Sequence, residues 1–168
     1  MLTLGTGVGS GIIIDGHIFK GYDGMGAEIG HSTLVQGGRM CACGRRGCVE
    51  AYCSATALIA RGREVLGDSC TNAKYVFSLA LEGDSNALEL IDEYAGHLAA
   101  SLSSIVTIFR PEILILGGGV ADAGDFLLDK VNALLPEATY NGPTIGVPPV
   151  VRATLGNAAG LIGAAFLK

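Results

Sequence analysis

Four residues with metal-binding side chains lie close together in the first third of the chain. They form the pattern His-x9-Cys-x-Cys-x4-Cys, made by His31, Cys41, Cys43 and Cys48. Three thiolates and one imidazole are a complete tetrahedral ligand set for Zn²⁺. Glycines at positions 37, 38, 44 and 47 would let this short loop wrap round an ion, because glycine adopts backbone conformations that other residues resist. A closed set of four protein ligands predicts a structural metal that does not itself activate water.

Two carboxylates flank this cluster. Glu28 lies three residues before His31 and Glu50 lies two residues after Cys48, so a loop folded round a metal would bring both near it. Carboxylates beside an imidazole are suited to accept hydrogen bonds from vicinal hydroxyl groups. A plainer alternative for Glu50 is a favourable charge at a helix N-terminus, and for Glu28 a solvated loop residue.

The composition indicates a globular protein with a large core. Of 168 residues, 49% are hydrophobic and 16% charged, which excludes a disordered tail. The net charge of −5, with no basic cluster larger than Arg45-Arg46, argues against nucleic-acid binding by this segment. The chain shows no signal-peptide pattern, and its apolar stretch Ala158–Leu167 is too short to span a bilayer. We therefore expect a cytoplasmic, reducing compartment and no membrane partner, so that clustered cysteines are metal ligands rather than disulfides.

The first part of the chain predicts strands joined by tight turns. A short apolar run at 2–4 is followed by the glycine-rich segment Gly5–Gly9 and a second run at 11–14. Asp15-Gly16 is typical of a two-residue hairpin turn, with the returning strand at 18–20. Residues 21–47 are dominated by glycine and polar residues. This composition predicts a loop whose shape is not fixed by packing in a hydrophobic core.

The remainder predicts helices alternating with strands. Apolar residues recur at helical spacing from Asn86 to about Phe109, which predicts the clearest helix. Further helices are expected at 50–65, at 125–135 where Pro136 would stop the helix, and at 157–167. Strands are expected at 112–116, directly before Gly117-Gly118-Gly119, and at 150–155. This order is typical of an α/β domain.

The motifs together resemble the ROK family of repressors, open reading frames and sugar kinases. Its signature is matched by Glu28-Ile29-Gly30-His31 followed by the run from Cys41 to Glu50. The segment Leu4–Gly9 resembles the family's second phosphate-binding motif, and Pro111–Gly119 its adenosine-proximal strand and loop. The cysteine motif is highly specific, whereas either glycine motif alone is a weak signal. The resemblance covers essentially the whole chain and implies a ribonuclease-H-like, actin-like ATPase fold with an inserted zinc-binding loop at about 21–50.

The resemblance also implies roles for individual residues. His31, Cys41, Cys43 and Cys48 would hold a structural zinc ion, and Glu28, His31 and Glu50 would contact sugar hydroxyls. ATP, bound with Mg²⁺, would meet backbone and hydroxyl donors of the two glycine segments, namely Gly5, Thr6, Gly7, Gly117, Gly118 and Gly119. Neither segment is a Walker A motif, because no Gly-Lys-Ser/Thr follows.

Two parts of the family's catalytic machinery have no match in the sequence. The family takes its catalytic Asp from just before the motif matched by Leu4–Gly9, and its first phosphate loop is an Asp-x-Gly-Gly-Thr sequence. No Asp precedes Asp15, and Asp-x-Gly-Gly-Thr does not occur. The expectation is that residues 1–168 form a single C-terminal lobe, that the base lies upstream of Met1 on an N-terminal lobe, and that this chain alone has little or no kinase activity.

The resemblance implies an ATP-dependent hexose kinase of carbohydrate metabolism. The run Cys48–Ala57 is most like the glucokinase members, so glucose phosphorylation at the head of glycolysis is the leading hypothesis. N-acetylmannosamine, fructose and allose remain alternative substrates, and the resemblance suggests a homodimer. The rival hypothesis is the sugar-sensing domain of a ROK transcriptional repressor, although both glycine motifs are intact here, which favours the kinase. A non-catalytic zinc-binding scaffold is a third possibility.

Several other candidate residues have plainer explanations. Cys53 is expected as a small core residue and Cys70 as a loop thiol, both outside the ligand pattern. His17 should be exposed beside its turn, and His97 should be a surface or packed residue of the long helix. Asp122 and Asp125 are best explained as helix caps.

Overall fold

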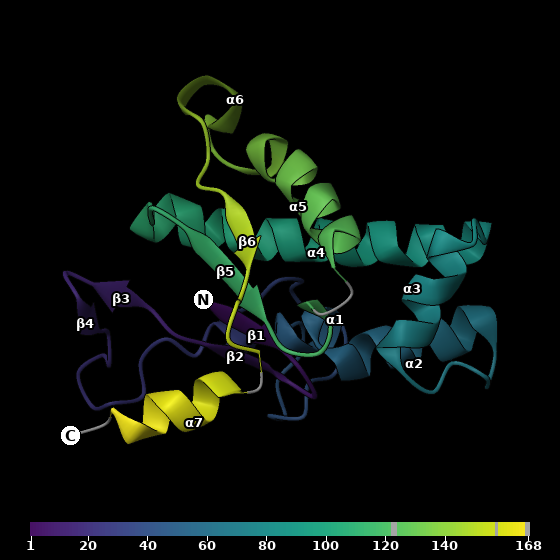
Figure 1. The fold of residues 1–168 in the computed structure, drawn as a ribbon, viewed down its shortest axis with the longest axis horizontal. Coiled ribbons are helices and arrows are strands. Elements are labelled where there is room, and N and C mark those ends of the chain that lie inside the picture. The colour runs from purple at the N-terminus through teal and green to yellow at the C-terminus, as the bar shows by residue number, and fades with distance from the viewer. Residues whose placement is uncertain (122–123, 157, 167–168) are drawn as a thin grey trace.

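A four-stranded sheet of order β2-β1-β5-β6 lies at the centre of the computed structural model, which describes residues 1–121, 124–156 and 158–166 (Figure 1). The strands of this sheet are β1 (Leu2–Leu4), β2 (Val8–Ser10), β5 (Leu114–Gly117) and β6 (Val150–Arg152), and a separate hairpin is formed by β3 (Ile13–Ile14) and β4 (His17–Ile18). The helices are η1 (Ile29–His31), α1 (Glu50–Cys53), α2 (Ala55–Leu66), α3 (Ala73–Leu81), α4 (Ser85–Phe109), α5 (Asp125–Ala138), α6 (Gly142–Ile145) and α7 (Ala158–Ala165).

The strand directions confirm the predicted α/β class. β1 and β2 are antiparallel, whereas β1 with β5 and β5 with β6 are parallel, with α5 making the crossover between the last two. Parallel neighbours end at the same edge of a sheet, and ligands of open α/β folds bind at that edge. The turn after β1, the glycines after β5 and the end of β6 therefore lie together.

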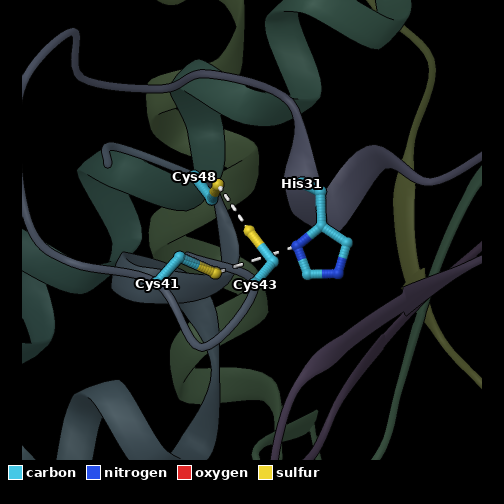
Figure 2. Close-up of side chains that lie close together, drawn as sticks. All are labelled: His31, Cys41, Cys43 and Cys48. Carbon is cyan, nitrogen blue, oxygen red and sulfur yellow. Dashed lines mark hydrogen bonds between the residues drawn. The ribbon is translucent and has the colours of Figure 1, made fainter. Parts of the chain in front are cut away.

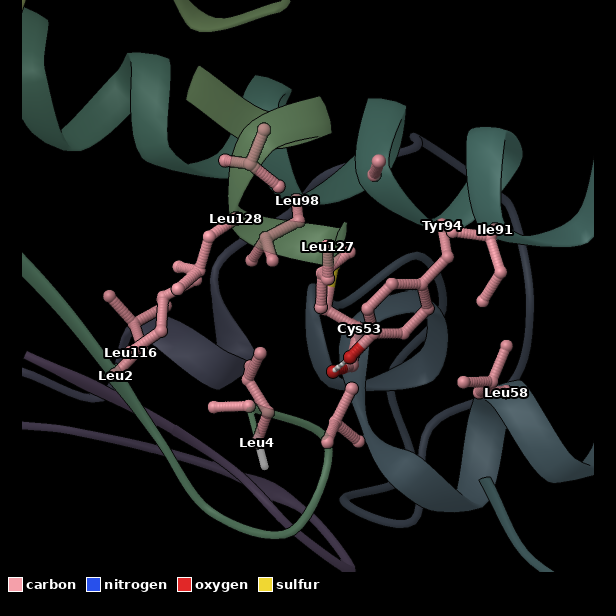
Figure 3. Packing of buried hydrophobic residues seen from close by; sticks show 14 of the residues in the cluster. Leu2, Leu4, Cys53, Leu58, Ile91, Tyr94, Leu98, Leu116, Leu127 and Leu128 are labelled. Atoms are coloured by element: carbon pink, nitrogen blue, oxygen red, sulfur yellow. Dashed lines mark hydrogen bonds between the residues drawn. The ribbon is translucent and has the colours of Figure 1, made fainter. Parts of the chain in front are cut away.

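The hydrophobic core fills the space between this sheet and the long helix α4. Leu2 and Leu4 of β1 and Leu116 of β5 are fully buried and face side chains of α4 and α5, among them Leu98 and Leu127 (Figure 3). Burying one leucine side chain contributes about 1.5–3 kcal/mol, so these layers fix the sheet to the helices. None of the helices in the described residues is long and apolar enough to cross a membrane.

The helix predicted at 50–65 is interrupted at Ser54. This residue has extended backbone geometry (φ −79°, ψ 160°), and its side chain accepts a hydrogen bond from the N–H of Ala57. Ser54 is therefore the N-cap of a new helix, α2, and α1 ends before it. The cap turns the chain sharply, directly after the cysteine loop.

Other boundaries also differ from the predictions. The second strand is Val8–Ser10, which begins within the glycine-rich segment, and helices α3 and α6 were not predicted. Helix α5 continues two residues past Pro136, which therefore lies in the last turn, where few helical residues remain to be disrupted. Asp125 lies in the first turn of α5 but is not its cap, since Gly124 occupies that position without a side-chain bond. Asp122 and Asn157 lie outside the described residues.

The outer edge of β6 is closed by a single side chain. Asn132 of α5 donates from Nδ2 to the Val150 carbonyl at 2.9 Å, and its Oδ1 accepts from the Val150 N–H at 3.0 Å. The amide group thus forms the pair of hydrogen bonds that a neighbouring strand would form. This contact fixes α5 to the sheet through polar bonds as well as apolar packing.

Two helical glycines have opposite surroundings and give a test of the packing. A Cβ at Gly62 of α2 would lie 2.4 Å from Cys70 Sγ, whereas a Cβ at Gly96 of α4 would meet nothing within 4 Å. We expect Gly62→Ala to lower the free energy of unfolding by about 1–3 kcal/mol through overpacking. Gly96→Ala should raise it by about 0.5–1 kcal/mol, because alanine is the better helix former. Chemical denaturation measures both, and equal effects would contradict this account of the α2 packing.

Candidate functional site

The four predicted metal ligands converge on one point. His31 comes from η1, Cys41 and Cys43 from the following loop, and Cys48 from the segment just before α1 (Figure 2). Their ligand atoms all lie within 4.8 Å of one another. His31 Nδ1 is 3.8 Å from Cys41 Sγ, and the sulfurs of Cys43 and Cys48 are 3.7 Å apart. The arrangement can hold one metal ion, as the spacing predicted.

Short backbone bridges and one close approach shape the loop round this point. Isolated bridges join Thr33 to Cys48 and Met40 to Arg46. Gly47 has φ of +83°, and a Cβ there would lie 1.7 Å from the Val35 carbonyl oxygen, so only glycine fits. Gly47 is thus a steric requirement of the loop that carries the cluster.

The pKa values of the three cluster cysteines are shifted in different directions by their surroundings. Burial raises the pKa of Cys41 to about 12, and burial also raises the pKa of Cys48. At exposed Cys43 the hydrogen bond from the Arg45 backbone N–H lowers the thiol pKa, and the Arg45 charge acts in the same direction. Buried thiols without a cation stay protonated near neutral pH, so a metal ion entering the cluster must displace their protons. Sulfur and imidazole ligands in fourfold coordination fit zinc.

The segment Glu28–His31 rests directly on β2. A Cβ at Gly30 would lie 2.2 Å from the Val8 carbonyl oxygen, so the two backbones touch. The Ser10 hydroxyl donates to the Ala27 carbonyl and accepts from the Ile29 N–H at 3.1 Å. Ala27 itself has φ of +66°, an uncommon conformation held by these contacts. The imidazole is therefore placed by the edge of the sheet as well as by the loop.

Glu50 lies at the cluster, as predicted. Glu28 is close to the ligand His31 in sequence, but its side chain is exposed. Glu50 Oε1 is 3.5 Å from Cys41 Sγ, and its Oε2 accepts from the Val8 N–H at 3.0 Å. Glu28 is exposed at the start of η1, where its side chain makes no capping bond. Glu50 is thus fixed by the protein, whereas the carboxylate of Glu28 is open to solvent.

The glycine segments lie at the ends of neighbouring strands. A cavity of about 270 Å³ opens there, and Gly117 and Gly118 form part of its wall together with Thr3 and Arg152. Gly118 has φ of +84°, and a Cβ there would lie 2.6 Å from the Leu4 carbonyl oxygen. Gly119, Gly5, Thr6 and Gly7 follow β5 or β1 but are not in the wall of this cavity. Arg152 was not predicted as part of this cavity, although a positively charged residue in a predicted strand was a signal for it.

A polar network on the other side of the cysteine loop was also missed. Arg39 donates to Glu93 of α4 at 2.7 Å, and Arg61 donates to the same carboxylate at 3.3 Å. Burial acts to raise the Glu93 pKa, but the hydrogen bonds and charges of the two arginines together lower it. The Tyr52 hydroxyl accepts from the Arg39 N–H at 2.8 Å, and the Tyr52 ring packs against His97. These residues join the loop to α2 and α4.

The remaining candidates are placed as follows. Cys53 is buried in α1, as expected for a core residue, and Cys70 is a loop thiol that is likewise buried. His17 is exposed, and His97 is half-buried. The turn between β3 and β4 is Asp15-Gly16, with φ of +51° and +76°, which confirms the hairpin signal.

Known proteins resemble the chain along its whole length. The glucokinase of Thermotoga maritima is 38% identical over 180 residues, which cover 99% of this chain and 56% of that protein. The N-acetylmannosamine kinase of Yersinia pestis is 38% identical, covering 98% and 54%. A crystal structure of a ROK family glucokinase from Streptomyces griseus, in complex with glucose and AMPPNP, superposes with a TM-score of 0.87 at 34% identity, covering 98% and 58%.

The chain spans about half the length of the curated relatives that it matches. The model of the ROK family matches residues 1–168, the full extent of the sequence. The cysteine cluster and the fold agree with this match. The chain belongs to the ROK family.

Proposed function

We propose that the chain is the sugar- and ATP-binding part of an ATP-dependent hexose kinase whose substrate is glucose. The observation that carries the proposal is the position of Glu50. Its carboxylate lies between the metal cluster and residues 5–9, the glycine turn. A sugar at Glu50 would therefore lie beside the phosphates of a nucleotide at the glycine turn. Relatives named glucokinase at 38% and 37% identity support the choice of sugar.

Each part of the site has a distinct task in this proposal. The three cysteines and His31 would hold a structural zinc ion, which supplies a rigid centre for the loop and no reaction chemistry. Glu28, His31 and Glu50 would orient the sugar ring through its hydroxyls, which lowers the barrier by positioning. The metal would fix the orientation of the imidazole, whose second nitrogen is then available to the sugar.

The nucleotide would bind along the carboxyl edge of the sheet. Backbone N–H groups of the glycine turn and the Thr6 hydroxyl are the proposed donors to the terminal phosphates, with Mg²⁺ shared by the nucleotide. The cavity beside Gly117 and Gly118 would take the adenosine and its proximal phosphates. Arg152 in its wall would add a positive charge at that end.

The proposal places the catalytic base outside residues 1–168. The purified 168-residue protein should therefore phosphorylate glucose at no more than background rate, because orienting groups without a base leave the hydroxyl unactivated. A coupled assay for glucose 6-phosphate with Mg-ATP measures this. Turnover at rates of about 1 s⁻¹ or faster, typical of a sugar kinase and free of contaminating enzyme, would contradict it.

Metal content tests the cluster directly. We expect one zinc ion for each chain in protein purified without chelator, and a large loss of zinc in Cys41→Ser, because a hydroxyl is a poor substitute for a buried thiolate. Cys53→Ala is the control, since Cys53 is equally buried but outside the cluster. Elemental analysis and thermal melting with and without chelator give the readouts. Wild-type protein without zinc, or equal zinc in Cys41→Ser, would refute the assignment.

The sugar role is tested most clearly at Glu28, whose carboxylate is exposed and makes no capping bond at η1. In a polypeptide that also carries the remaining half of the family's length, Glu28→Gln should raise the KM for glucose about tenfold, as expected for losing a charge-assisted hydrogen bond. The KM for ATP should stay the same. Glu89→Gln, exposed on α4, is the matched control, and an unchanged KM for glucose in Glu28→Gln would remove Glu28 from the sugar site.

A further inference from the structure

The N–H group of Val8 has no partner within the sheet. Hydrogen bonds join Met1 to Gly11 and Gly5 to Gly7 across the β1–β2 pair. Because such bonds alternate along an antiparallel pair, Val8 faces Leu4 at a non-hydrogen-bonded position, and its N–H points away from β1. Val8 is buried, so this donor needs an acceptor from elsewhere.

Glu50 supplies that acceptor from a position 42 residues further along the chain. Its Oε2 accepts from the Val8 N–H at 3.0 Å, and a Cβ on Gly7 would lie 2.4 Å from the same oxygen. The carboxylate is therefore packed against the backbone of the glycine turn. Since a carboxylate has about four acceptor positions, this bond and the Cys41 contact leave room for a sugar hydroxyl.

The residues after Glu50 hold the same turn at two further points. The N–H of Ala55 donates to the Gly5 carbonyl at 2.8 Å. The Thr56 hydroxyl donates to the Thr6 carbonyl at 2.7 Å. With Glu50, these bonds make residues 50–56 a bracket that contacts both sides of the glycine turn.

The bracket is joined rigidly to the metal cluster. Cys48 precedes Glu50 by two residues, and Val49 between them is buried and donates its N–H to the Ser32 carbonyl at 3.0 Å. At the other end, the buried Tyr94 hydroxyl of α4 donates to the Cys53 carbonyl. Displacement of the cluster would therefore move Glu50 against the turn.

We propose that Glu50 is a positioning residue through which the metal cluster holds the glycine turn in its phosphate-binding conformation. The metal and the nucleotide would then be linked, so that each favours binding of the other. The phosphate-binding role of the turn rests on the proposed function, whereas the mechanical link between cluster and turn does not.

Amide hydrogen exchange by NMR on the 168-residue chain tests the link without any substrate. In Glu50→Ala the Val8 amide should exchange about tenfold faster or more, because a bond to a charged acceptor is lost. Glu50→Gln should restore most of the protection, since its amide oxygen still accepts. Removing zinc by chelation should also speed exchange at Val8. The Leu114 amide, which bonds to the Pro149 carbonyl across β5 and β6, is the internal reference and should not change.

Glu89→Ala on the exposed face of α4 controls for loss of a carboxylate. Unchanged exchange at Val8 in Glu50→Ala, or equal acceleration at Val8 and Leu114, would overturn the proposal. If chelation unfolds the chain, Glu50→Ala decides alone, because it keeps all four ligands. Titration with Mg-AMPPNP separates the two proposals, since a failure of wild-type protein to bind counts against the nucleotide site and not against the link.

Discussion

The convergence of four ligand atoms on one point is the constraint on which the site depends. In the described residues 32–48 the buried side chains are those of Cys41 and Cys48, and both are ligands. This segment therefore has almost no hydrophobic core, and apolar burial cannot fix its shape. Its order must come from the cluster, from backbone bridges and from the contacts of Arg39 with α4. Everything that the segment positions, including His31 and Glu50, depends on the same point.

The cluster was predictable because its signal is local. Ligand types at short spacing, with glycines between them, are sufficient to identify such a loop. Helix α4 was predictable for a similar reason, since twenty-five residues of regular apolar spacing leave little ambiguity. The carboxylate Glu50 could be placed near the cluster for the same reason of short sequence distance.

Features that depend on distant partners could not be predicted. The sequence around Ser54 gives no distinctive sign of a helix boundary. The break between α1 and α2 at Ser54 is stabilised by contacts of α2 with the glycine turn. Glu93 lies 54 residues from Arg39, so nothing in either neighbourhood indicates their pairing. Pro136 was expected to end a helix, but the rule holds for interior positions and the helix ends two residues later in any case. For Ser54 and Glu93 tertiary context decided the outcome, whereas for Pro136 its position near the helix end decided it.

Helix side chains that contact the two outer strands of the sheet have a consequence for how the molecule behaves in a crowded solution. An uncovered edge strand invites pairing with another chain, which leads to aggregation. On β6 the Asn132 amide occupies both groups of Val150. On β2 the Val8 N–H donates to Glu50, and Gly30 packs directly against the Val8 carbonyl oxygen. At Val150 and Val8 neither edge offers a free N–H group to an incoming strand, and on β2 a contact that builds the site also keeps the sheet from growing.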